Sequence, residues 1–281
     1  MVRRYRVQLL SLLAHNPFLA NFFGGRIYQG PLKAVCMPGI NCYSCPAAAG
    51  ACPLGSLQSF FSGLQPRFPA YVLGVLLFFG LLLGRTVCGW LCPFGLVQEL
   101  LYRLPGRKLG KSGLTARLSR LKYLWALLFV VVLPLGFWFF SGWGVPAFCK
   151  YLCPVGTLEG AVPLFIAQEG LRRSAGLLTG WKLAVLVLLL GLMIFAWRPF
   201  CRWLCPLGAF YGLFNRQALT GVTVDRSRCT GCGACARTCK MDISVAGDRE
   251  CISCGECIAS CPEKAIVFRG PGGDSSKRTT R

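Results

Sequence analysis

The sequence is poor in histidine and in acidic residues, and each shortage narrows what the chain can be. His15 is the one histidine among 281 residues, and only three of the ten acidic residues precede residue 225, namely Glu99, Glu159 and Glu169. Zinc sites often recruit histidine, so this shortage argues against a zinc protein. The sequence also has no Ser/His/Asp set, no phosphate-binding loop and no paired carboxylates. It therefore gives no support to independent hydrolytic or acid–base catalysis.

What the sequence has in excess is apolar surface and positive charge. Hydrophobic residues make up 54% of the chain, the mean hydropathy is +0.53 and the formal net charge is +21. This apolar content is typical of membrane spans. The basic residues flank apolar runs and no nucleic-acid-binding motif is present, so we expect membrane lipid as a partner and no nucleic acid. The N-terminal apolar stretch lacks a small-residue cleavage site and is interpreted as a retained anchor.

Four apolar runs have about the length that crosses a bilayer, roughly 20 residues. The first is weak and is broken by Asn16-Pro17. The expected spans are 7–23, 68–84, 123–140 and 180–197. We expect residues 24–68, rich in glycine and proline, to be a loop. The fold class predicted is a mainly α membrane protein with about four transmembrane helices.

Basic residues predict the orientation, because they gather on the cytoplasmic side of a membrane. Residues 1–6 and 103–122 are the basic segments, and the second has seven Lys/Arg and no acid. We therefore expect a multi-pass protein of the cytoplasmic membrane. The N-terminus, residues 85–122 and everything after 198 would be cytoplasmic, and residues 24–68 and 141–180 would face the other side. If the first span does not cross, this alternation loses its start.

The chain repeats a Cys-Pro-x-Gly motif four times, and this repeat organises the cysteines. The motif begins at Cys52, Cys92, Cys153 and Cys205, and the last three copies follow another cysteine by four residues. Spacing of four places both thiols on one helical face, and the proline then bends or ends the helix. Two such pairs fall at the inner face and would together bind one [4Fe–4S] cluster: Cys88, Cys92, Cys201 and Cys205.

Six further cysteines are expected at the outer face, two more than one cluster needs. They are Cys149 and Cys153 of the third motif with the loop residues Cys36, Cys42, Cys45 and Cys52. We predict an outer cluster bound by Cys149 and Cys153 plus two of Cys42, Cys45 and Cys52. A disulfide among the loop cysteines is the alternative, because an oxidising compartment permits it.

The C-terminal cysteines have the spacing of a bacterial two-cluster ferredoxin. Cys-x2-Cys-x2-Cys-x3-Cys occurs twice, and in that motif each fourth cysteine binds the other run's cluster. The two predicted ligand sets are therefore Cys229, Cys232, Cys235 and Cys261, and Cys251, Cys254, Cys257 and Cys239. Val222–Val224 and Ile266–Phe268 could pair as a short ribbon. We expect a transmembrane domain at 1–218, a small α+β two-cluster ferredoxin domain at 219–269 and a disordered tail at 270–281.

With these motifs the chain resembles the membrane-bound 4Fe-4S polyferredoxins of the NapH/NosR/CcoG-like type. The resemblance rests on Cys88-x3-Cys92-Pro93, Cys201-x3-Cys205-Pro206 and the eight tail cysteines, and covers about residues 69–268. It implies electron transfer, in NapH-like members between quinol and a redox partner protein. The chain departs from this pattern by adding Cys42, Cys45 and the Cys149/Cys153 motif at the outer face. It lacks the flavin-bearing domain of some relatives.

The resulting hypothesis is a membrane electron-transfer component of an oxidoreductase system. It would connect a cytoplasmic ferredoxin domain with a quinone or an outer-face redox partner. The alternatives are a redox assembly or maturation factor and a redox-sensing regulator of a partner metalloenzyme.

Several polar residues near the motifs have two interpretations each. Arg85, Lys150, Arg198 and Arg202 could stabilise reduced clusters or anchor at the interface by snorkelling. Polar residues after the motifs and at the first helix break could serve a quinone or be ordinary interfacial side chains: Gln98, Glu99, Glu159 and His15.

Overall fold

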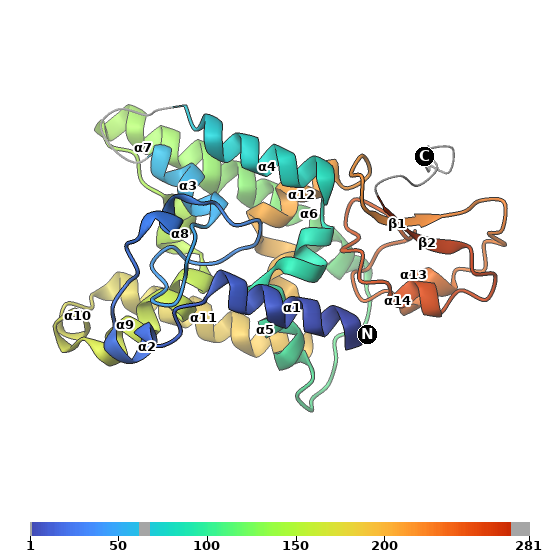
Figure 1. Ribbon diagram of the computed structural model, residues 1–281, viewed down its shortest axis with the longest axis horizontal. Helices are drawn as coiled ribbons and strands as arrows, with labels where there is room; N and C mark the ends of the chain where they lie inside the picture. Colours follow the sequence, from blue (N-terminus) through green and yellow to red (C-terminus); the bar gives the residue numbers. More distant parts are fainter. Residues whose placement is uncertain (1, 62–67, 271–281) are drawn as a thin grey trace.

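A computed structural model describes residues 2–61 and 68–270 of the chain. Residues 271–281, nearly all of the predicted disordered tail, lie outside the described residues. Residues 2–218 form a mostly helical part and residues 219–270 a smaller unit at one end of it, which we call the tail unit (Figure 1). The long helices of the helical part run roughly along the same axis, and the tail unit lies beyond their ends.

The helical part consists of short and long helices, some of which follow one another without a break. In chain order these are α1 (Val2–His15), α2 (Asn21–Gly24), η1 (Pro31–Ala34), α3 (Pro53–Phe60), α4 (Ala70–Leu82), η2 (Val87–Leu91), α5 (Pro93–Tyr102), α6 (Gly113–Ala126), η3 (Leu127–Val132), α7 (Leu133–Ser141), α8 (Ala147–Tyr151), η4 (Gly156–Ala161), α9 (Val162–Ala167), α10 (Glu169–Arg173), α11 (Leu177–Phe195), η5 (Phe200–Leu204) and α12 (Pro206–Phe214).

Two helical segments among the described residues are long and apolar enough to cross a membrane. Gly113–Ser141 joins α6, η3 and α7 over 29 residues, and Leu177–Phe195 is α11, with hydropathies of 2.2 and 2.3. Only 11% and 17% of their apolar windows are buried inside the protein. Because an apolar surface of this kind needs lipid around it, the chain is a membrane protein. The expected spans 123–140 and 180–197 correspond to these segments.

The other two expected spans differ from the helices observed. The expected span 7–23 is wrong in its bounds, because α1 begins at Val2 and ends at His15, where Asn16-Pro17 interrupts it. The expected span 68–84 contains the apolar helix α4, Ala70–Leu82, but α4 has 13 residues, short for a crossing at 1.5 Å per residue. Residues 24–68 are also not one loop, since η1 and α3 lie within them.

Prolines account for the wide helical turns. η2, η3, η4 and η5 are π-turns, and each is followed by a proline two positions after its last residue: Pro93, Pro134, Pro163 and Pro206. A proline has no N–H to donate, so the preceding turn loses its i→i−4 bond and can widen. Two of these turns, η2 and η5, carry Cys88 and Cys201.

The tail unit contains a two-stranded sheet, α13 (Ala234–Thr238) and α14 (Glu256–Ala259). β1 (Gly221–Val224) and β2 (Ile266–Arg269) pair antiparallel with Val222 opposite Phe268 and Val224 opposite Ile266. This confirms the predicted ribbon. The pairing brings the two ends of the tail unit together, so that the two cysteine runs between them fold back on each other.

Glu250 of the tail unit enters the helical part and pairs with its cations. The carboxylate forms ion pairs with Arg85 and Lys122 and accepts a hydrogen bond of 2.8 Å from the Tyr123 hydroxyl. Burial opposes the charge, but Arg85 and Lys122 outweigh it and lower the pKa of Glu250. Asn215 adds hydrogen bonds to the carbonyls of Asp248 (2.7 Å) and Cys251 (2.9 Å). These contacts fix the tail unit against the membrane helices.

Candidate metal centres

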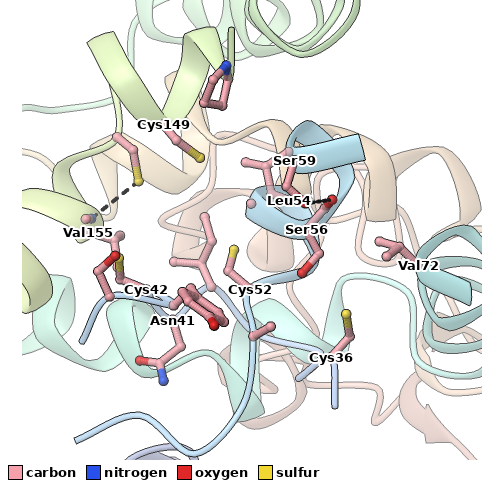
Figure 2. A pocket seen from close by; sticks show the side chains of 18 of the residues that line it. Cys36, Asn41, Cys42, Cys52, Leu54, Ser56, Ser59, Val72, Cys149 and Val155 are labelled. Carbon is pink, nitrogen blue, oxygen red and sulfur yellow. Dashed lines mark hydrogen bonds between the residues drawn. The ribbon is translucent and has the colours of Figure 1, made fainter. Parts of the chain in front are cut away.

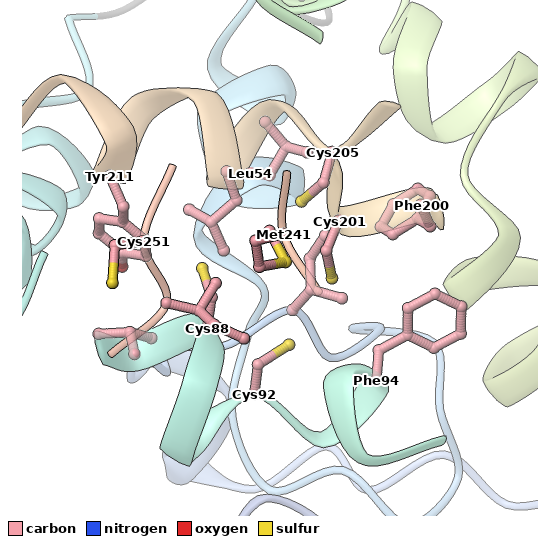
Figure 3. Close-up of a cluster of buried hydrophobic side chains, with 14 of the residues drawn as sticks. Leu54, Cys88, Cys92, Phe94, Phe200, Cys201, Cys205, Tyr211, Met241 and Cys251 are labelled. Atoms are coloured by element: carbon pink, nitrogen blue, oxygen red, sulfur yellow. The ribbon is translucent and has the colours of Figure 1, made fainter. Parts of the chain in front are cut away.

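Four cysteines from two distant motifs surround a small pocket in the helical part, the inner pocket. Cys88 lies on η2 and Cys201 on η5, and each is followed by its motif partner, Cys92 or Cys205. All four line the same pocket and are buried, with their sulfurs directed toward a common centre (Figure 3). Phe94 and Phe200 close one side, with rings 5.2 Å apart.

The Cys-Pro-x-Gly repeat has a local structural reason. Cys92 and Cys205 have extended backbones, with ψ of 116° and 112°, and are the N-caps of α5 and α12. The proline fits the first helical position, where no N–H is needed. The Gly208 N–H donates to the Cys205 sulfur over 3.3 Å, and the Gly156 N–H to Cys153 over 3.5 Å. The expectation that Cys201 and Cys205 share one α-helix is therefore wrong, because a π-turn and a helix start separate them.

Two arginines bond across the inner pocket in a reciprocal way. Arg198, three residues before Cys201, donates to the Cys88 carbonyl over 2.5 Å, and Arg85, three residues before Cys88, donates to the Cys201 carbonyl over 3.3 Å. A Cβ on Gly95 would stand 3.2 Å from the Arg198 guanidinium, so the glycine leaves room for it. Each motif thus holds the backbone of the other.

The interfacial interpretation of these arginines is wrong for three of the four basic residues. Arg85 and Arg198 are completely buried and Arg202 is 5% exposed, so none reaches toward a membrane surface. Arg202 pairs with Asp242 of the tail unit. Lys150 is the exception, because it is exposed and lies over the Tyr151 ring.

Glu99 is buried between two arginines and is not an interfacial residue. Its carboxylate pairs with Arg198 at 2.5 Å and with Arg4 of α1 at 2.7 Å. Two cations around one carboxylate leave a net positive charge beside the four thiols. Such a charge favours anionic ligands in the inner pocket.

The tail unit brings together the two crosswise cysteine sets that the spacing predicts. One pocket is lined by Cys229, Cys232, Cys235 and Cys261, and a second by Cys239, Cys251, Cys254 and Cys257. Cys235 lines both pockets, so the two lie side by side. Gly233 and Gly255 have φ of 70° and 82°, a left-handed conformation that glycine adopts without strain at the turns after Cys232 and Cys254.

The outer pocket is much larger and is lined by five of the six remaining cysteines. Its volume is about 710 Å³, against 10 to 30 Å³ for the other three pockets. Cys42, Cys52 and Cys149 lie around one part of it, whereas Cys36 lies apart (Figure 2). Cys153, the fifth, also lines the pocket, and its sulfur accepts the hydrogen bond from the Gly156 N–H. The four that gather are Cys42, Cys52, Cys149 and Cys153.

Cys45 does not line this pocket. Its thiol is buried beside Ala47 and Ala48 and lies 3.6 Å from the Asn16 amide oxygen. Of the three loop cysteines offered for the outer set, the structure thus brings Cys42 and Cys52 to the third motif and leaves Cys45 aside. All cysteines are free thiols, with no disulfide among the described residues.

The thiol sets of these pockets provide the donors of an iron–sulfur cluster. Within residues 2–61 and 68–270, no three His, Cys, Asp or Glu side chains are spaced to bind a single metal ion. Each four-thiol set instead lines one pocket, and four cysteine thiolates are the ligands that a [4Fe–4S] cluster takes. Burial raises the pKa of the Cys92 thiol to about 12 and that of Cys239 to about 11. Iron binding must therefore displace protons from these thiols.

The sequence also carried a signal that the motif analysis missed. The sixth residue after the motif cysteine points into the opposite half of the same site: Gln58, Gln98 and Glu159. The Gln98 amide lies 2.9 Å from the Cys201 sulfur, Gln58 accepts a hydrogen bond from the Cys149 N–H, and Glu159 accepts one from the Cys42 N–H. Gln98 and Glu159 are among the polar residues that the sequence already places after the motifs, whereas Gln58 is not, and the spacing Cys-Pro-x-Gly-x-x-Gln, present twice, could have revealed it.

The repeated motifs and four-thiol pockets define an iron–sulfur protein, and comparisons with known families agree. A 4Fe-4S binding domain family matches residues 66–112, 123–169 and 178–223, each copy containing one Cys-x3-Cys-Pro motif. A second 4Fe-4S binding domain family matches residues 222–243. The chain belongs to the membrane-bound polyferredoxin family of ferredoxin-type proteins.

Several similar proteins are ferredoxin-type proteins. The methylamine utilization ferredoxin-type protein MauN of Paracoccus denitrificans is 36% identical over 65% of this chain and 58% of its own length. MauN of Methylorubrum extorquens is 31% identical over 76% and 70%, and the ferredoxin-type protein NapH of Haemophilus influenzae is 32% identical over 69% and 65%. The chain thus spans 58% to 70% of the length of these relatives. No solved structure matches it.

Proposed function

We propose that the protein is a membrane electron-transfer protein that holds four [4Fe–4S] clusters in a row. The ligand sets are the two of the tail unit, the inner set Cys88, Cys92, Cys201 and Cys205, and the outer set Cys42, Cys52, Cys149 and Cys153. When bound, such clusters supply one-electron transfer. The chain itself supplies thiolates, buried cations and hydrogen bonds to sulfur that set the potentials.

The observation that carries this proposal is the continuity of the four pockets. Ile40 lines both the outer and the inner pocket. The loop around it reaches inward from the outer cysteines, and the Tyr211 hydroxyl donates to the Pro38 carbonyl over 3.0 Å. A hydrocarbon core about 30 Å thick would separate clusters at its two faces too widely. An inward loop that shares one residue between the pockets removes that difficulty.

The inner pocket and the two tail-unit pockets are also joined through neighbouring or shared residues. Gly89, next to Cys88, contacts Ile252, which lines a tail-unit pocket beside Cys251. The Trp90 indole N–H donates to the Ser253 carbonyl over 2.8 Å. Beyond this pocket Cys235 is shared with the last one, where Cys229 and Cys232 are exposed. The exposed end would exchange electrons with a redox partner protein.

The outer pocket has room for an electron acceptor or donor beside its thiols. Apolar residues such as Leu54, Phe60 and Val72 line it together with Lys33 and Lys182. An apolar pocket with a few polar groups is typical of sites for small organic molecules. We propose a quinone here, rather than at Gln98 or Glu99, whose side chains are buried at the inner pocket.

We further propose the orientation that the basic segments predict, with the two long segments, Gly113–Ser141 and Leu177–Phe195, as the membrane-crossing helices. The Lys111 ammonium of the basic connector donates to the Arg237 carbonyl of the tail unit over 2.8 Å. Gln8 of α1 donates to the Gly89 carbonyl over 3.0 Å. The N-terminal helix, the basic connector and the tail unit thus gather at one end, which would be cytoplasmic (Figure 1).

The test is electron delivery to menadione in lipid vesicles, started by a photoreduced deazaflavin. Intact protein should reduce menadione, and Cys88→Ser should stop this while the tail-unit clusters still become reduced. Cys45→Ser, which alters a thiol outside the four sets, serves as the control and should retain the rate. Full menadione reduction by Cys88→Ser would contradict the proposal.

A further inference from the structure

Gln98 is placed to act on the inner ligand set without being a ligand. It lies on α5, six residues after Cys92, and is completely buried. Its Nε2 is 2.9 Å from the sulfur of Cys201, which belongs to the other motif of the same set. The same nitrogen contacts the Phe94 carbonyl at 3.3 Å, which helps to hold the amide in place.

The direction of this hydrogen bond is fixed once the Cys201 thiol is an iron ligand. A thiolate bound to iron has no proton and can only accept a hydrogen bond, so the NH2 end of the amide must face it. In a buried site a donor aimed at a sulfur stabilises negative charge more strongly than it would in water. Because cluster reduction adds negative charge, this donor favours the reduced state.

We propose that Gln98 is a positioning residue that raises the reduction potential of the cluster bound by Cys88, Cys92, Cys201 and Cys205. The inference rests on the proposed function, since it needs a cluster in the inner pocket. The buried Arg85 and Arg198 act on carbonyls of Cys201 and Cys88. Gln98 differs from them because it contacts a sulfur directly, and hydrogen bonds to the sulfurs are among the factors that set a cluster's potential.

Gln58 provides a matched control within the same chain. It occupies the equivalent position after Cys52 and is also completely buried. Its amide is used differently, because Oε1 accepts from the Cys149 N–H over 3.1 Å and Nε2 donates to the Phe129 carbonyl over 2.7 Å. Replacing Gln58 therefore removes an amide at the equivalent position of another copy of the motif. It leaves the sulfurs of the inner pocket unchanged.

The test is an EPR-monitored redox titration of the full chain in detergent. The inner cluster's signal is identified as the one lost in Cys88→Ser. Gln98→Met, similar in shape but without a donor, should lower the midpoint potential of that signal and leave the iron content unchanged. Gln58→Met should leave that potential where it is in the wild type. An unchanged potential in Gln98→Met with full iron content would overturn the inference.

A second measurement needs no variant, in case Gln98→Met loses iron. Wild-type protein is labelled with 15N in its glutamine side-chain amides and the reduced inner cluster is measured by HYSCORE. A 15N coupling is expected from the Gln98 amide, and its absence would overturn the inference. If Cys88→Ser removes no signal, the fault lies instead with the proposed inner cluster.

Discussion

Gly89 lies so close to the Ile252 carbonyl that a Cβ atom at position 89 would stand 2.0 Å from that oxygen. Gly89 is next to an inner-pocket cysteine, Cys88, and Ile252 is next to a tail-unit cysteine, Cys251. The obstacle is backbone, which cannot rotate away as a flexible side chain can. The contact between the helical part and the tail unit therefore depends on the absence of a side chain at position 89.

Gly89→Ala should separate the two parts of the protein without removing a ligand. We expect iron content to stay near the wild-type value and electron transfer from the tail unit to the inner pocket to slow by about 10-fold or more, since small displacements in a reacting pair have such effects. Stopped-flow reduction followed by freeze-quench EPR measures this rate. Gly74→Ala is the control, because no atom lies within 4 Å of its added Cβ. Equal rates in the two variants would contradict the role of this contact.

Glu250→Gln should loosen the tail unit by a different route. The substitution leaves Arg85 and Lys122 buried without their shared carboxylate. Breaking a buried ion pair on one side costs about 3 kcal/mol. We expect a lower midpoint for thermal unfolding and faster proteolysis after residue 218. In Glu169→Gln, which breaks an exposed pair with Arg173, the midpoint should hardly move.

Serine substitutions distinguish the outer ligand set from the other loop cysteines. Cys52→Ser and Cys149→Ser should each lower the iron content by about four atoms per chain, the content of one cluster. Cys45→Ser should keep all of its iron, because Cys45 lies outside the outer pocket. Iron analysis by mass spectrometry is the measurement. Loss of iron in Cys45→Ser alone would show that the outer set is assigned incorrectly.

Trypsin accessibility tests the proposed orientation. Arg226 and Arg228 of the tail unit are exposed, as are Arg172 and Arg173 at the opposite end of the helical part. Cleavage after Arg228 is expected in inside-out vesicles and protection in spheroplasts. The sites at Arg172 and Arg173 should give the reverse pattern. Cleavage of both ends from the same side would contradict a membrane-crossing arrangement.

The arrangement of the tail unit is the easiest part of the structure to predict, because it depends on the spacing of cysteines within a short stretch of sequence. The spacing of two cysteine runs predicts which thiols gather, and Cys229 and Cys261 do line one pocket despite lying 32 positions apart. The β1–β2 ribbon was predicted from its two apolar ends and is confirmed. That these thiols bind clusters remains a prediction.

The helical part was less open to prediction, because its contacts depend on packing between distant segments. Hydropathy predicts where apolar helices lie, but it does not reveal that Ile40 reaches inward to the inner pocket. Charge counts likewise treat Arg198 as a surface cation, whereas Glu99 and the Cys88 carbonyl satisfy it in the interior. The outer set stayed ambiguous in the sequence, since Cys42 and Cys45 differ only in the direction that their loop gives each thiol.

Iron and acid-labile sulfide per chain, measured after strictly anaerobic purification in detergent, test the central claim most directly. Four clusters require about 16 irons and as many sulfides. Cys88→Ser and Cys201→Ser should each reduce this to about 12. About eight irons in the wild type, unchanged in both variants, would mean that the membrane motifs hold no cluster and would contradict the account.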